Sequence, residues 1–68
     1  MTLEQLILNV ELQGNITIKV YDYTEEDYCG EFPYTTDQHG IILDWFGAYY
    51  IKFIYPEHNG VIIEISAE

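Results

Sequence analysis

Between Tyr21 and Glu31, five acidic residues are interleaved with three tyrosines, and these side chain types can bind cations. Five of the ten residues from Asp22 to Glu31 carry a carboxyl group, and none is basic. Carboxylates accept bidentate hydrogen bonds from guanidinium groups, and aromatic rings stack on the same cations. We therefore predict a partner-binding patch with these members: Tyr21, Asp22, Tyr23, Glu25, Glu26, Asp27, Tyr28 and Glu31. A solvated charged turn flanked by ordinary strand tyrosines is the alternative interpretation.

The carboxylates of this segment are also potential oxygen ligands for a metal ion. Their spacing lacks the glycine at position six and the closing glutamate of an EF-hand loop. His39, His58 and Cys29 do not have the spacing of zinc ligands. We expect weak association with calcium or magnesium through charge alone, no dedicated metal site and no cofactor.

Residues for nucleophilic catalysis are scarce. No serine or cysteine stands beside a histidine in a nucleophile motif, and no glycine-rich loop follows a predicted strand to hold phosphate. The anionic surroundings of Cys29 disfavour the reactive thiolate. We expect the chain not to be an enzyme.

The charge balance restricts the partners. The chain has twelve acidic residues and only two lysines, Lys19 and Lys52. Its formal net charge is therefore −10 on 68 residues. This excess of negative charge attracts basic surfaces and repels nucleic acids and anionic lipids. Proteins bind phosphate groups with lysine and arginine side chains, of which this chain has few. The expected partner is a basic protein surface, that of a nucleic-acid-binding protein, with no direct contact to nucleic acid or membrane.

Hydrophobic periodicity predicts the helices and strands that carry these residues. Thr2 and Gln5 fit a capping box, and an apolar stripe with helical spacing predicts a helix over 3–10. Strict alternation over 15–23 predicts a strand whose aliphatic side chains face the core. Further strands are expected over 28–32, ended by Pro33, and over 49–55 and 61–66. A charged turn over 24–27 and a hairpin loop over 56–60, with Asn-Gly supplying positive φ values, connect them.

Residues 34–48 allow more than one interpretation. A loop is expected over 36–40, followed by the apolar run 41–46. Periodicity over six residues does not separate a buried strand from a helical turn. We favour a short helix or 3₁₀ turn over 41–46.

The sequence thus predicts one α+β domain over residues 1–68. Its N-terminal helix packs on a four-stranded antiparallel sheet. The predicted core consists of Leu3, Leu6, Ile7, Val10, Ile16, Ile18, Val20, Ile51, Phe53, Val61, Ile63 and Ile65, with Trp45 or Phe46 closing one end. A single cysteine, an acidic N-terminal segment and no apolar run of about 20 residues lead us to expect a cytoplasmic protein.

The chain also has two loose resemblances to known groups of proteins. The order of a capped helix, then Ile18-Lys19-Val20-Tyr21-Asp22, then Gly60-Val61-Ile62-Ile63-Glu64-Ile65 is similar to short uncharacterised proteins of Gram-positive bacteria and their phages. Size, charge and α+β pattern resemble small acidic proteins of mobile elements that block host defence nucleases, including DNA-mimic anti-restriction and anti-CRISPR proteins. This resemblance implies an inhibitor and assigns no residue a role.

Two functions from different classes follow. The first is a non-enzymatic acidic protein that inhibits a nucleic-acid-binding host protein, such as a defence nuclease, by occupying its basic groove. The second is a small assembly module that self-associates through strand edges, because 49–55 carries one charge and would pair with another copy if it lay at an edge. The first function suits a monomer and the second a homodimer.

The charge imbalance yields a first prediction. The repulsion among uncompensated carboxylates destabilises the folded state, and salt screens it as the Debye length falls from about 30 Å at 0.01 M to about 3 Å at 1 M. The melting temperature, followed by circular dichroism, should therefore rise with sodium chloride over this range. A flat or falling response would contradict the prediction and indicate that metal ions or a second copy already neutralise the carboxylates.

Overall fold

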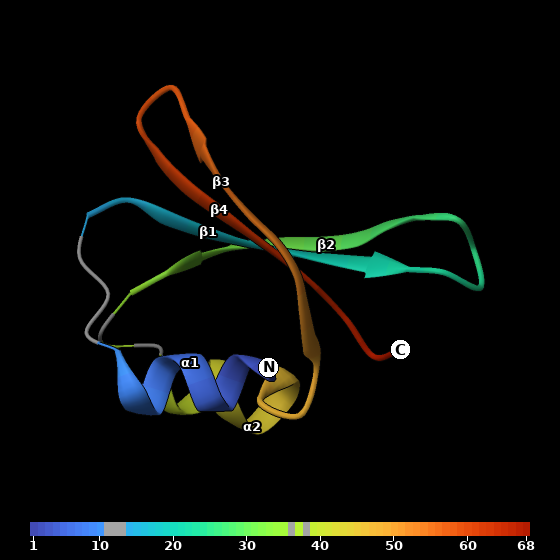
Figure 1. Ribbon diagram of the computed structural model, residues 1–68, viewed down its shortest axis with the longest axis horizontal. Coiled ribbons are helices and arrows are strands. Elements are labelled where there is room, and N and C mark those ends of the chain that lie inside the picture. Colours follow the sequence, from blue (N-terminus) through green and yellow to red (C-terminus); the bar gives the residue numbers. More distant parts are fainter. Residues whose placement is uncertain (11–13, 36, 38) are drawn as a thin grey trace.

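Two helices lie on one face of a four-stranded sheet in this protein. The computed structural model describes residues 1–10, 14–35, 37 and 39–68. The elements are, in chain order, α1 (Leu3–Asn9), β1 (Ile16–Asp22), β2 (Asp27–Tyr34), α2 (His39–Phe46), β3 (Tyr50–Glu57) and β4 (Gly60–Ser66). Both helices lie beside each other below the sheet, and the turns of the β1–β2 and β3–β4 hairpins point in different directions (Figure 1). The predicted α+β class is confirmed.

The capping box fixes the start of α1. The Gln5 amide donates to the Thr2 hydroxyl at 3.2 Å, and the Thr2 amide donates to the Gln5 side-chain oxygen at 2.9 Å. The helix ends at Asn9 rather than Val10, which adopts an extended conformation as the C-cap.

Within the described part of the chain, no helix is long and apolar enough to cross a membrane.

The sheet is mixed, so the expectation of a wholly antiparallel sheet was wrong. Its strand order is β2-β1-β4-β3, with antiparallel pairs at both sides and a parallel pair, β1 with β4, in the middle. Sequence-adjacent strands form two hairpins, as their short turns require. The chain between them passes through α2 before β3 and β4, and this crossover allows the first and last strands to pair in parallel.

The core lies between the helices and the central strands. Ile18 pairs with Ile63 and Val20 with Ile65 across the parallel ladder, and all four side chains are buried. The helices cover them with four further buried side chains: Leu3, Leu6, Ile7 and Ile42.

Two predicted core residues are instead exposed. Val10 is 48% exposed because it follows the end of α1. Phe53 is 60% exposed because β3 carries a bulge at Lys52, so that Ile51 pairs with Ile65 but Phe53 pairs with Glu64. The extra residue transfers Phe53 to the sheet face opposite the helices.

The ambiguous segment contains a helix, which confirms the favoured interpretation of 41–46. The helix α2 already begins at His39, whose Nδ1 lies 2.8 Å from the Tyr34 hydroxyl. His39 and Gly40, which we expected in the loop over 36–40, therefore belong to the helix. Thr36 and Gln38 of that loop lie outside the described residues. Phe46, rather than the exposed Trp45, packs against the core.

Strand boundaries differ from expectation at two prolines. The strand β2 continues past Pro33 to Tyr34, and β3 contains Pro56. Both are edge strands, where a residue without an amide donor is tolerated.

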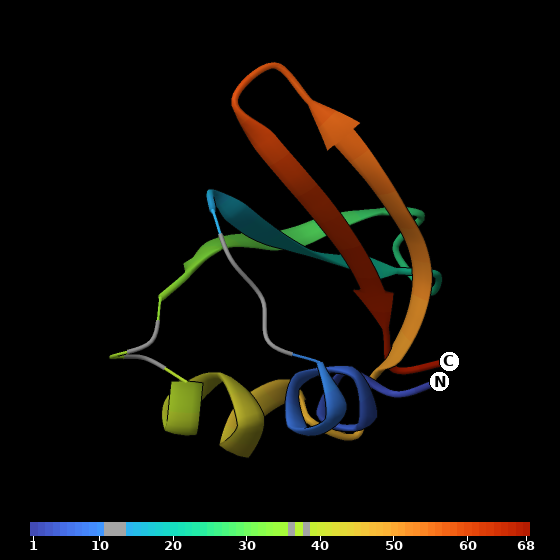
Figure 2. The ribbon, with the colours of Figure 1, turned by 60° about the vertical axis from the view of Figure 1, so that its left-hand side comes forward.

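The N-terminus pairs with the start of β3. The Ile51 amide donates to Met1 O and the Leu3 amide to Tyr49 O, each at 2.9 Å. Figure 2 shows the N-terminus beside this end of β3.

The turn at Asn59-Gly60 does not use the positive φ values that we expected. Among the described residues, positive φ occurs at Gly14 (89°) and Glu26 (55°). Gly60 instead begins β4, and a Cβ placed there would lie 2.0 Å from the backbone oxygen of Asn15. Close approach of two backbones is the reason for this glycine.

This contact predicts opposite effects for two glycine substitutions. Gly60→Ala should destabilise the protein by about 1–3 kcal/mol or more, because backbone cannot move aside cheaply. Gly40→Ala is the control, since its Cβ would meet nothing within 4 Å in α2. It should stabilise by about 0.4–1 kcal/mol. Urea unfolding measures both, and a tolerated Gly60→Ala would contradict the close packing of β4 on residue 15.

Candidate functional site

The β1–β2 hairpin holds the predicted patch, and two of its acidic residues order the turn. Asp22 Oδ1 accepts hydrogen bonds from the amides of Thr24 at 2.8 Å and Glu25 at 3.4 Å. Asp27 Oδ1 accepts from the Tyr28 amide at 2.7 Å. These carboxylates therefore have structural partners within the hairpin.

Three other carboxylates of the predicted patch are exposed. Glu25 and Glu26 lie in the turn, and Glu31 lies on the edge strand β2. The hairpin extends beyond the layer of helices, so its turn can be approached from several sides (Figure 1). Glu25, Glu26 and Glu31 are thus the acidic side chains best placed to meet a partner.

The predicted tyrosines form one cluster at the base of this turn. The ring of Tyr21 lies 4.8 Å from that of Tyr23 and 5.1 Å from that of Tyr28, both in edge-to-face arrangement. A bulge in the β1–β2 ladder places Tyr21 opposite Tyr28. All eight predicted patch residues therefore belong to one hairpin.

Both lysines of the chain also lie at this cluster. Strand alternation placed Lys19 on the same face as Tyr21 and Tyr23, whereas the position of Lys52 was not predicted from the sequence. Lys19 Nζ is 5.3 Å from the centre of the Tyr28 ring. Lys52 Nζ is 5.7 Å from the Tyr23 ring and 5.8 Å from the Tyr50 ring. Cation–π attraction holds each ammonium group against aromatic rings. The cluster therefore already accommodates cations.

Glu64 is a further member of the site that was not predicted from the sequence. It is 9% exposed on β4, on the sheet face opposite the helices. The Tyr28 hydroxyl donates to its Oε1 at 2.9 Å, and the Tyr55 hydroxyl donates to its Oε2 at 2.5 Å. One carboxylate thus joins the two edge strands across the sheet. In the sequence, a single acidic residue within the apolar run 61–65 was the feature that could have indicated this role of Glu64.

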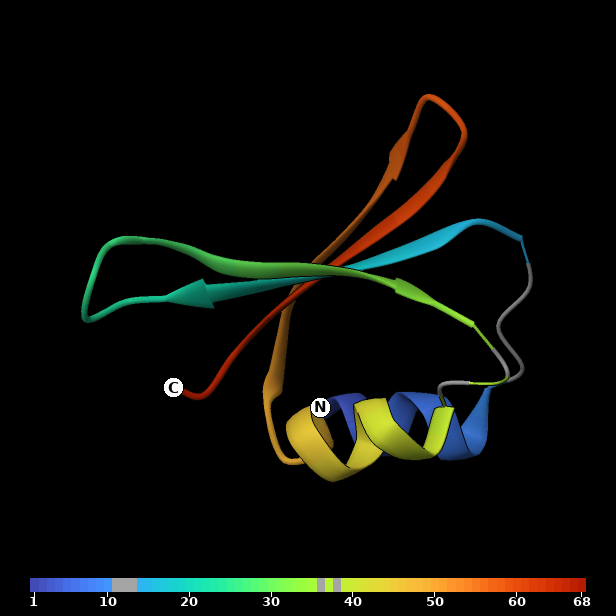
Figure 3. The ribbon, with the colours of Figure 1, turned by 180° about the vertical axis from the view of Figure 1, so that it is seen from behind.

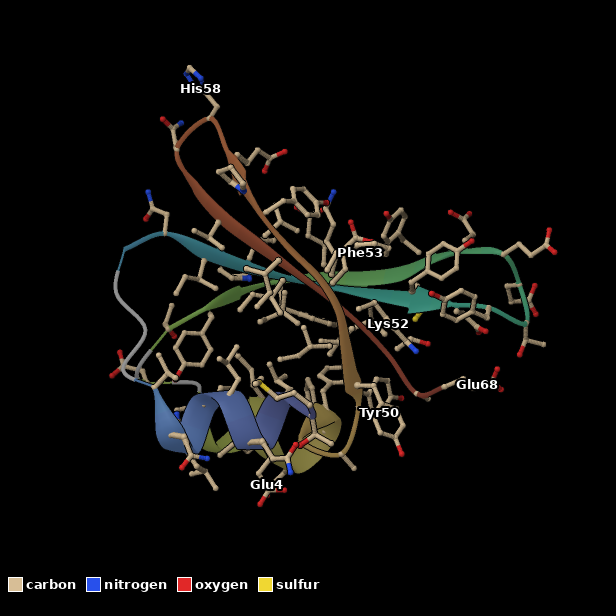
Figure 4. The ribbon with its side chains drawn as sticks, viewed as in Figure 1. Glu4, Tyr50, Lys52, Phe53, His58 and Glu68 are labelled. Atoms are coloured by element: carbon tan, nitrogen blue, oxygen red, sulfur yellow. The ribbon has the colours of Figure 1, made fainter. Side chains whose placement is uncertain are left out.

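Glu64 and the tyrosine cluster line a small open pocket of about 180 Å³. It is lined by Tyr21, Tyr23, Tyr28, Lys52, Phe53 and Glu64. Figure 4 shows Lys52 and Phe53 beside the middle of β3, on the side toward which the β1–β2 hairpin extends. The bulge that exposes Phe53 therefore also brings its ring into this pocket.

The histidines and the cysteine, all of which the structure describes, lie far apart in the fold. His58 lies at the tip of the β3–β4 hairpin (Figure 4), His39 lies at the start of α2, and Cys29 is exposed on β2. Among the residues that the structure describes, no group of three His, Cys, Asp or Glu side chains could hold a metal ion. The arrangement around Glu64 is suited to binding a cationic group.

A separate apolar hollow of about 330 Å³ lies between α2 and β2. Its lining is Phe32, Pro33, Ile41, Ile42, Trp45 and Phe46. Trp45 is 62% exposed there. Figure 3 shows α2 in front of α1, at the outer side of the helix layer. This hollow lies on the helical side of the sheet, at the end of β2 that is far from the charged turn.

Comparison with known proteins identifies no relative of this chain. No protein-family model, no curated protein and no solved structure matches it.

The hydrogen bonds to Glu64 predict a pH dependence. The bond to Glu64 raises the pKa of Tyr55 from 10.0 to about 12, and removal from water and the negative charge of Glu64 act in the same direction. The same causes raise the pKa of Tyr28. Because the folded-state pKa is raised, this stabilisation is fully present below about pH 10 and is lost as the pH rises towards about 12.

Urea unfolding at a series of pH values tests this expectation. The free energy of unfolding should fall between about pH 10 and about pH 12 more steeply for the wild type than for Tyr55→Phe, which cannot ionise at this position. Equal slopes would show that the hydroxyl of Tyr55 does not interact with Glu64.

Proposed function

We propose that this chain is a non-enzymatic binding protein that inhibits a nucleic-acid-binding host protein by occupying its basic groove. The supporting observation is the β1–β2 hairpin, which carries the exposed carboxylates of Glu25, Glu26 and Glu31 beside a tyrosine cluster. Carboxylates in such an array can take the positions that phosphates occupy in a groove lined with lysine and arginine.

The overall charge supports the same proposal. A net charge of −10 steers the protein towards positive surfaces and accelerates association. The tyrosines add contact area at low entropic cost, with a polar tip that tolerates water. A defence nuclease of the host is the kind of target that we propose, and the cytoplasm is where the inhibitor would meet it.

Charge reversal at the turn tests this proposal. Immobilised protein is exposed to bacterial lysate at low salt, and bound proteins are eluted with sodium chloride and identified. Glu25→Lys/Glu26→Lys should lose the retained nucleic-acid-binding protein, because these side chains are expected to meet its basic groove. The melting temperature should change little, since both positions are exposed.

The matched control is Asp44→Lys/Glu57→Lys, which alters the net charge equally at exposed positions outside the hairpin. It should retain the target. The eluted protein should also release fluorescent duplex DNA when the wild-type chain is added. Equal losses in both double variants, or no displacement of DNA, would contradict the proposal.

Self-association through β3 is the second candidate. This strand lies at the edge of the sheet and exposes Tyr50, Phe53 and Ile54, which favours pairing with another copy. The bulge at Lys52, Pro56 and the pairing of Met1–Leu3 with Tyr49–Ile51 all oppose it, because they interrupt or occupy the edge. Sedimentation separates the candidates: a stable homodimer supports assembly, and a monomer supports the inhibitor.

A further inference from the structure

The pocket beneath the tyrosine cluster has aromatic walls and a carboxylate among its lining groups. Rings of Tyr21, Tyr23, Tyr28 and Phe53 surround it together with Glu64. Its volume of about 180 Å³ is below the roughly 300–1,000 Å³ of sites for drug-sized ligands. It therefore suits the end of one side chain better than a whole small molecule.

Glu64 has unused capacity to accept hydrogen bonds. Each of its carboxylate oxygens accepts one hydrogen bond, from the hydroxyl group of Tyr28 or of Tyr55. An ionised carboxylate offers about four lone-pair sites. Because a charge buried to this extent is stabilised by pairing with an opposite charge, a cation entering the pocket would gain both attraction and hydrogen bonds.

We propose that this pocket receives an arginine side chain of the basic partner; this inference rests on the proposed function. A guanidinium group is planar, so it can stack on a tyrosine ring while its fork of donors meets a carboxylate. Lysine, a compact and strongly hydrated point charge, would use only part of this arrangement. The arginine would anchor a complex whose approach the hairpin carboxylates direct.

Lys52 acts as the internal competitor of that arginine. Lys52 is one of the residues that line the pocket, and its Nζ lies 5.7 Å from the centre of the Tyr23 ring. The side chain is exposed on a bulge of an edge strand, so it can leave without disturbing the core. In the complex, the arginine would replace Lys52 as the cation against these rings.

The probe for this site is N-acetyl-arginine methylamide, titrated into isotope-labelled protein and followed by NMR. We expect saturable shifts confined to the pocket residues, and no saturable shift with the neutral citrulline analogue. Glu64→Gln should bind the probe about 10-fold more weakly, since hydrogen bonds to charged groups are the strong ones. Glu57→Gln removes the same charge at an exposed position outside the pocket and should bind as the wild type does.

A second pair of variants keeps the test valid if Glu64→Gln fails to fold. Phe53→Ala removes an exposed wall of the pocket and should weaken binding by about 2- to 5-fold, whereas its neighbour Ile54→Ala, also exposed and outside the lining, should not. Lys52→Gln should strengthen binding, because the competitor is gone.

Equal binding of the arginine and citrulline probes would overturn the inference. So would an equal effect of Glu57→Gln and Glu64→Gln, or weaker binding by Lys52→Gln. Capture of the nucleic-acid-binding target separates this inference from the proposed function. If Glu64→Gln retains the target and Glu25→Lys/Glu26→Lys loses it, the proposed function stands without an arginine anchor.

Discussion

The parallel pairing of β1 with β4 holds this structure together. It joins two hairpins that would otherwise be separate, and a two-stranded hairpin alone is barely stable in water. Its register puts Ile18 beside Ile63 and Val20 beside Ile65 under the helices. The same register puts Lys19 beside Glu64 on the opposite face. Core and candidate site are therefore two consequences of one alignment.

Glu64 extends this organisation to the edge strands. Its carboxylate accepts hydrogen bonds from the hydroxyl groups of Tyr28 on β2 and Tyr55 on β3. A buried acid therefore links the two edge strands of the sheet. The proposed binding face thus combines strands linked through Glu64 with a projecting turn ordered by Asp22. Hydrogen bonds formed before binding reduce the ordering that binding would otherwise require.

Local patterns predicted what local interactions determine. The capping box predicted the start of α1, alternation predicted the buried face of β1, and a charged turn between two predicted strands indicated the β1–β2 hairpin. Contacts between distant segments were not predictable in this way. Alternation alone placed Phe53 in the core, and the single extra residue at Lys52 reverses its face. The parallel ladder, and with it the neighbours of Glu64, depends on a crossover that no local pattern encodes.

Hydrogen exchange of the complex with the captured target tests whether the helix-free face and the β1–β2 hairpin form the binding surface. We expect slower amide exchange at residues 20–32 and 61–66 on binding, with the helices α1 and α2 unchanged. Protection confined to α2 and the apolar hollow beside it, or to the free edge of β3, would show that the partner binds elsewhere.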